Sequence, residues 1–256
     1  MRRRFSNDLV PDEAVLNRIR ARRKFGRKIL VVEGQKDEEF VEHYLNLNSD
    51  VQVAISNGKR NAIQAIEELG LEQEVLALVD WDYEWLDSDS LVYPRPHMCA
   101  YDGHSLESFK FFFSRPYQPG IEEICARWLG ILRAFNHQQR GSLDFNNRRD
   151  HLVEIFQEAI DDGDDSVFVN QMLGLLGAHN AFGITSENFK NEIADQIPSR
   201  LDGSLQYLIH GHDIETFHDV AKGQGSFAKA SSEELQTRVE KSTMFAFLAE
   251  HGFVHG

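Results

Sequence analysis

The stretch Ile29-Leu30-Val31-Val32-Glu33-Gly34 decides the fold class of this 256-residue chain. Four consecutive aliphatic residues without polar alternation predict a strand that is buried on both faces, as in a parallel sheet. Glu33 and Gly34 end this strand, and the apolar residues from Phe40 to Leu47 then recur at helical spacing. A strand that leads directly into a helix is the first half of a βαβ unit.

The same order repeats along the next fifty residues. Residues 51–55 and 75–79 predict two further short strands, and residues 62–69 between them have the periodicity of a helix. Alternating strands and helices of this length imply right-handed crossovers and a parallel sheet with helices on its faces. We therefore expect an α/β fold, a parallel sheet flanked by helices.

The pattern changes after Pro116 and Pro119, where helical periodicity dominates. It is strongest in residues 120–137, 148–160, 167–177 and 232–250. We expect three parts: a basic helical segment over residues 1–28, an α/β domain over 29–115, and a mainly α-helical region over 116–256 that packs on it.

Composition excludes several classes of protein. With 41% hydrophobic and 27% charged residues the chain has a globular balance, which disfavours disordered or collagen-like chains. The longest apolar run, residues 172–178, is far shorter than the roughly 20 residues of a membrane span. The basic residues 2–4 are followed by Phe-Ser-Asn-Asp rather than by an apolar segment, unlike in a secretory signal. Two cysteines, Cys99 and Cys125, make no disulfide framework, so we expect a cytoplasmic location.

Charge is distributed unevenly along the chain. Residues 1–28 carry ten basic and three acidic residues, a sum of +7, which leaves the remainder of this −14 chain at −21. The basic segment is therefore either a contact for a polyanion or an ordinary solvated helix. Because the acidic remainder repels nucleic acid, we expect activity on such a substrate to require homodimerisation or ordering of residues 1–28.

Acidic side chains follow two of the predicted strands. Glu33 ends the first strand, and Asp80 and Asp82 follow the third, separated by Trp81. Side chains two residues apart in extended chain point the same way, and the carboxyl ends of parallel strands meet at one edge. Three close carboxylates repel one another unless a hard cation binds them, which indicates Mg²⁺ or Mn²⁺. The alternative is that each is a helix cap or a turn residue.

Two further groups lie near these carboxylates in the predicted fold. Lys59 and Arg60 follow Gly58 at the end of the second strand, where a helix begins, so they could contact a substrate phosphate. An ordinary turn with two exposed bases is the alternative. His104 could donate a proton to the leaving oxygen, although one of 11 histidines can fall near a motif by chance.

Four motifs in order carry a resemblance to a known family. They are Val31-Val32-Glu33-Gly34-Gln35-Lys36-Asp37, Asn57-Gly58-Lys59-Arg60-Asn61, Asp80-Trp81-Asp82 and Asp102-Gly103-His104-Ser105-Leu106-Glu107-Ser108-Phe109. Together they resemble the Toprim domain of topoisomerases, primases and OLD-type nucleases. They are most similar to a stand-alone Toprim-like family, formally of unknown function, that includes the nuclease effector of the PARIS anti-phage system.

The resemblance implies roles that the residues alone do not establish. It makes Glu33 a general base or metal-bound glutamate, Asp80 and Asp82 metal ligands, and Glu107 a ligand to a second cation. From the residues alone, Glu107 could instead be an ordinary carboxylate in the first turn of a helix. It implies an Mg²⁺-dependent nuclease that acts on RNA, specifically host tRNA, as the toxic effector of a phage defence, held and released by an ABC-type ATPase. Glu84 stands where topoisomerases have a third aspartate, which disfavours topoisomerase chemistry.

Other functions stay open at this point. The Toprim-like core could be inert, with the chain acting as an adaptor that docks on an ATPase, or it could be a nuclease directed at DNA. A primase would use the same carboxylates, but no nucleotide pocket is evident in the sequence. A zinc site made by His210, His212 and His218 is disfavoured because the spacing lacks the pattern of structural zinc sites.

Overall fold

The computed structural model describes residues 13–23, 27–69, 74–87, 93, 95–112, 120–197, 205–221 and 228–255. The chain forms two compact units, each built from separate stretches of sequence. The first comprises Met1–Asp80, Val92–Tyr101 and Leu235–Gly256, and the second comprises Trp81–Leu91 and Asp102–Glu234. Each unit is described by itself.

A four-stranded parallel sheet forms the centre of the first unit, as the sequence predicts. Its strands are β1 (Lys28–Val32), β2 (Val51–Ile55), β3 (Val75–Val79) and β4 (Met98–Ala100), in the order β2-β1-β3-β4. Val32 of β1 pairs with Ile55 of β2 and with Leu78 of β3, so the three strands end at the same edge. The α/β prediction is therefore confirmed.

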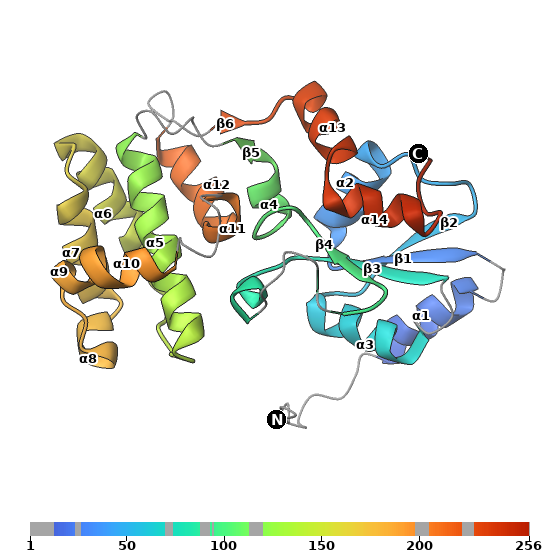
Figure 1. The fold of residues 1–256 in the computed structure, drawn as a ribbon, viewed down its shortest axis with the longest axis horizontal. Helices are drawn as coiled ribbons and strands as arrows, with labels where there is room; N and C mark the ends of the chain where they lie inside the picture. The colour runs from blue at the N-terminus through green and yellow to red at the C-terminus, as the bar shows by residue number, and fades with distance from the viewer. Residues whose placement is uncertain are drawn as a thin grey trace. The chain divides into compact units, whose positions relative to one another are not determined.

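Helices cover both faces of this sheet (Figure 1). On one face lie α1 (Glu13–Arg23) and α3 (Lys59–Leu69); on the other lie α2 (Gln35–Tyr44) and α14 (Thr243–Glu250). Because both faces are covered, the residues of β1 from Ile29 onward and all of β3 are buried, which explains their uninterrupted apolar sequence. Ser242 caps α14 by accepting a hydrogen bond from the Phe245 N–H at 3.1 Å, so the predicted helix 232–250 is two helices, α13 (Ser232–Glu240) and α14.

Within the basic N-terminal segment the structure describes a helix that packs on the sheet, whereas Lys28 at its end already belongs to β1. In α1, Val15, Leu16 and Ile19 are buried, at 1%, 2% and 0% exposure. Their spacing of three and four residues forms one apolar face, which contacts β1, β2 and α3. Arg20, on the more exposed side, forms an ion pair of 2.5 Å with Glu68 of α3. The helix therefore contributes to the core of the first unit; residues 1–12 and 24–26 of the segment lie outside the described residues.

The second unit is mainly helical. Its longer helices are α5 (Ile121–Gln138), α6 (Arg149–Asp162), α7 (Asp165–Leu175) and α12 (Gly211–Val220). Its shorter elements are η2 (Glu84–Asp87), α4 (Leu106–Phe109), β5 (Phe111–Phe112), α8 (Ala178–Phe182), α9 (Ser186–Asn188), η3 (Phe189–Ile193), α10 (Ala194–Gln196), α11 (Leu205–Leu208) and β6 (Ala228–Lys229). Phe156 and Phe217 stack at 3.9 Å between ring centroids, with Phe168 edge-on to both, so aromatic packing joins α6, α7 and α12.

Of the helices in the described ranges, none combines the length and the apolar character that a bilayer crossing requires. Cys99 and Cys125 are both buried and neither forms a disulfide. Burial raises the pKa of the Cys125 thiol well above its usual value, with the Asp165 carboxylate as the next contribution. Cys125 is therefore a packed core residue and not a reactive thiolate.

Candidate functional site

Glu33 and Asp80 meet at the carboxyl edge of the sheet in the first unit. Each directly follows the last residue of its strand, and β1 and β3 are neighbours in register. Glu33 Oε1 accepts a hydrogen bond from the Asp80 N–H at 2.8 Å, which fixes the glutamate side chain across the ends of both strands. Both residues are partly buried. A carboxylate has about four lone-pair positions, so it can accept this hydrogen bond and also bind a hard cation.

Lys59, which follows the end of β2, reaches the same edge of the sheet as Glu33 and Asp80. Gly58, with φ of 110°, occupies a conformation that favours glycine, and its N–H donates to the Glu33 carbonyl at 2.9 Å. This turn begins α3 with Lys59, whose Nζ donates to the Asp80 carbonyl at 2.5 Å and lies 5.6 Å from the centre of the Tyr93 ring. The Glu33 carboxylate, the Asp80 backbone and the Lys59 ammonium group, which follow three adjacent strands, therefore lie at one edge of the sheet. Arg60, the next residue, is exposed.

Asp37 has a structural role in the same unit. One carboxylate oxygen accepts from the Gly34 N–H at 3.0 Å and caps α2, and the other accepts from the Tyr101 hydroxyl at 2.8 Å. Burial, together with the Asp37 carboxylate, raises the pKa of Tyr101 well above its usual value, so this phenol stays protonated as the donor. Asp37 therefore orients the helix that follows Glu33.

The remaining predicted residues, Asp82, His104 and Glu107, belong to the second unit. Asp82 has φ of 52°, and its N–H donates to the His104 carbonyl at 2.9 Å. The His104 ring is 1% exposed and lies edge-on to Tyr83 at 4.5 Å and tilted against His210 at 4.9 Å. Its expected role as a proton donor stays a prediction.

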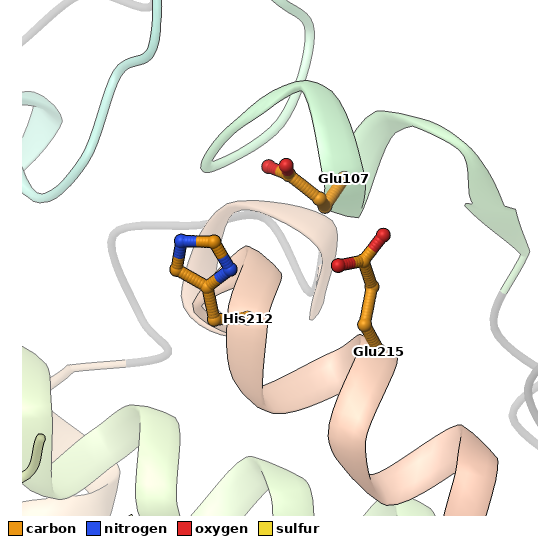
Figure 2. A group of neighbouring side chains, drawn as sticks. All are labelled: Glu107, His212 and Glu215. Atoms are coloured by element: carbon orange, nitrogen blue, oxygen red, sulfur yellow. The ribbon is translucent and has the colours of Figure 1, made fainter. Parts of the chain in front are cut away.

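Glu107 of α4 lies beside two residues of α12 (Figure 2). One ligand atom from each of Glu107, His212 and Glu215 lies within 4.8 Å of the other two. Among the described residues, no other group of three or more His, Cys, Asp or Glu side chains comes together in this way. His212 is exposed and Glu215 is partly buried. Ser105, the N-cap of α4, donates from its hydroxyl to Glu107 Oε2 at 3.1 Å.

The start of α12 is held in place by a buried ion pair. Arg133 of α5 donates to both carboxylate oxygens of Asp213, at 2.6 and 2.9 Å, and the two side chains are 9% and 5% exposed. The guanidinium also lies 4.2 Å from the centre of the Phe145 ring. This pair fixes the rotation of α12, and with it the direction in which His212 and Glu215 project.

Burial controls protonation around this helix start. It lowers the pKa of His210 to about 4, with Asp213 opposing the shift and Arg133 adding to it, so the imidazole is neutral at pH 7. Burial also raises the pKa of Tyr83, against the opposing charge of Arg133, and its hydroxyl donates to the Leu208 carbonyl at 3.1 Å. Both groups are therefore uncharged near neutral pH.

The sequence analysis did not group His212 and Glu215 with Glu107. It considered His212 only with His210 and His218, whereas the structure places the His218 ring 5.2 Å from that of Phe111. The available signal was the i, i+3 spacing of His212 and Glu215, which puts two ligands on one face of a helix. Their proximity to Glu107 depends on tertiary packing and has no local sequence signal.

Comparisons with known proteins assign no role to these residues. No protein-family model matches the chain, and no curated protein matches it either. A function can therefore be assigned only from the chain's own residues and from the resemblance of its motifs.

Proposed function

We propose that this protein is a divalent-metal-dependent nuclease that hydrolyses phosphodiester bonds at the carboxyl edge of the parallel sheet. The observation that supports this most is the Glu33 carboxylate bridging to the Asp80 backbone, with Lys59 Nζ on the Asp80 carbonyl. Carboxylates and an ammonium group at one strand-end edge are the groups that phosphoryl chemistry needs.

The donor set fits a hard cation. Glu33 and Asp80 offer carboxylate oxygens at adjacent strand ends, which suits Mg²⁺ or Mn²⁺ better than a softer metal. Such an ion, when bound, supplies activation of water and neutralisation of charge on the phosphate. We propose Asp82 as a further ligand from the sequence motif alone, because it belongs to the second unit.

The chain's own residues would then act on substrate in separate roles. Glu33 accepts the proton of the attacking water, since the hydrogen bond from the Asp80 N–H holds its carboxylate at the strand ends. Lys59 offsets the negative charge that builds on the phosphoryl oxygens, and the exposed Arg60 contacts the flanking backbone phosphate.

The biological setting that we propose comes from the motif resemblance. The substrate would be RNA, with tRNA preferred, cleaved in the cytoplasm by a homodimer as the toxic effector of an anti-phage system. An ABC-type ATPase would hold the protein and release it.

Cleavage of a labelled tRNA and a plasmid in parallel, with Mg²⁺, Mn²⁺ or a chelator, tests the nuclease. Glu33→Gln is the key variant, because its amide oxygen can still accept the Asp80 N–H while the charge is lost. We expect at least ~100-fold slower cleavage, the usual contribution of a general base. Glu42→Gln, the same change at an exposed position of α2, is the matched control and should cleave normally.

Equal cleavage by Glu33→Gln and the wild type would contradict the assignment. Faster cutting of the plasmid than of tRNA would keep the nuclease but replace RNA with DNA as its substrate. A calorimetric titration that detects no Mg²⁺ or Mn²⁺ binding would favour the inert adaptor.

A further inference from the structure

The Glu107, His212 and Glu215 group differs in chemistry from the sheet-edge carboxylates. It combines one imidazole with two carboxylates, and its ligand atoms lie within 4.8 Å of one another. In Figure 2 Glu107 of α4 lies across from His212 and Glu215, which project from successive turns of α12. Ligands around a tetrahedral Zn²⁺ lie about 3.3 Å apart, given ~2.0–2.1 Å bonds. The exposed His212 and the partly buried Glu215 would have to rotate to reach that separation.

A glycine permits this approach of the two helices. A Cβ at Gly211 would lie 2.2 Å from Ser105 Oγ, 2.8 Å from Glu107 Cβ and 2.9 Å from Glu107 Oε2. Separations of this size are far inside van der Waals contact, so a side chain at residue 211 would push α4 and α12 apart. Gly211 is thus required for Glu107 to come near His212 and Glu215.

The supporting contacts resemble those that orient metal ligands in proteins. Ser105 donates to Glu107 Oε2, which is the kind of outer hydrogen bond that fixes a ligating carboxylate. The Arg133–Asp213 pair fixes α12 one residue beyond His212. Two of the three ligands therefore come from a helix whose orientation is set by buried contacts.

His210, two residues before His212, has a buried imidazole nitrogen. His210 Nδ1 is buried and has no hydrogen-bond partner among the described residues, and its ring lies 5.5 Å from that of His212. Buried polar atoms are rarely left without a partner in native proteins. A water molecule, with or without a cation beside it, can supply this hydrogen bond.

From these observations we infer that Glu107, His212 and Glu215 form a second metal site, which takes a first-row transition-metal dication, Zn²⁺ in particular. An imidazole in the donor set favours Zn²⁺ over Mg²⁺, which binds oxygen ligands and keeps its waters. Three protein ligands leave one position of a tetrahedral ion for water. This inference does not depend on the proposed nuclease activity, because it concerns residues of the second unit alone.

Calorimetric titration of the full chain with Zn²⁺, in a millimolar excess of Mg²⁺ that saturates hard oxygen sites, tests the inference. We expect one equivalent of Zn²⁺ to bind to the wild type. In His212→Ala and in the nearly isosteric Glu215→Gln, the dissociation constant should rise more than about 100-fold, beyond the 10- to 100-fold of an outer-contact loss. His218→Ala, a histidine removed from the same helix away from the group, is the matched control and should bind like the wild type.

The visible absorption of the Co²⁺-substituted protein reports the coordination geometry of the metal, which a binding affinity does not. A tetrahedral Co²⁺ site has intense visible bands, and these should disappear in His212→Ala and persist in His218→Ala and in Glu33→Gln. Absence of Zn²⁺ binding, or binding that survives in both His212→Ala and Glu215→Gln, would overturn the inference. A normal Zn²⁺ titration with no cleavage of tRNA or plasmid would overturn the nuclease proposal and leave this site intact.

Discussion

Breaking the Arg133–Asp213 ion pair should destabilise the second unit strongly. The pair has two charge-assisted hydrogen bonds of 2.6 and 2.9 Å, and its side chains are only 9% and 5% exposed. Removing one partner of a buried pair leaves the other charge in a poorly solvated position, which costs about 3–5 kcal/mol. Asp213→Asn keeps one oxygen acceptor for the guanidinium, so we expect a loss of about 3 kcal/mol in the free energy of unfolding.

Chemical denaturation followed by tryptophan fluorescence measures this loss, because the three tryptophans of the chain, Trp81, Trp85 and Trp128, all belong to the second unit. A cycle with Arg133→Met, Asp213→Leu and the double variant isolates the pair. We expect each single variant to lose about 3–5 kcal/mol and the double variant to lose clearly less than their sum, since no charge is left unpaired. Single losses below ~1 kcal/mol, or losses that simply add, would refute the reasoning.

Three further changes test the packing that positions the site residues. His210 has a pKa of about 4 in the folded protein, below its ordinary 6.5, so the unfolded state binds more protons between these values and the protein becomes less stable as pH falls. From pH 7.5 to pH 5 the free energy of unfolding of the wild type should fall by about 2 kcal/mol more than that of His210→Phe. Urea titrations that give the two proteins equal pH profiles would refute this. Gly211→Ala should cost about 1–3 kcal/mol by overpacking against Ser105 and Glu107 and should weaken Zn²⁺ binding, whereas unchanged thermal unfolding would show that the helices can separate freely. Ile19→Ala should cost about 2–5 kcal/mol because Ile19 is fully buried, and a variant as stable in urea as the wild type would mean that α1 does not belong to the core.

The sheet could be predicted from the sequence because its strands are short apolar runs with clear ends. Residues 29–32, 51–55 and 75–79 lie within or coincide with β1, β2 and β3. β4 had no such signal, since Met98-Cys99-Ala100 is neither long nor rich in β-branched residues. Its pairing with β3 is a tertiary contact, as is the packing of residues 235–256 with the sheet from the far end of the chain.

The candidate site could be predicted only in part, for a similar reason. Glu33 and Asp80 come together because both directly follow paired strands, a relation that local sequence carries. His212 and Glu215 meet Glu107 across some hundred residues of sequence, through the close approach at Gly211. Neither helical periodicity nor motif spacing specifies such a contact.

Anomalous diffraction from crystals soaked in Mn²⁺ tests most directly whether the strand-end carboxylates hold a catalytic cation. The account predicts a Mn²⁺ peak within coordination distance of the Glu33 and Asp80 carboxylates, and its absence from crystals of Glu33→Gln grown and soaked in the same way. A wild-type map with no peak at the ends of β1 and β3 would contradict the proposed nuclease site.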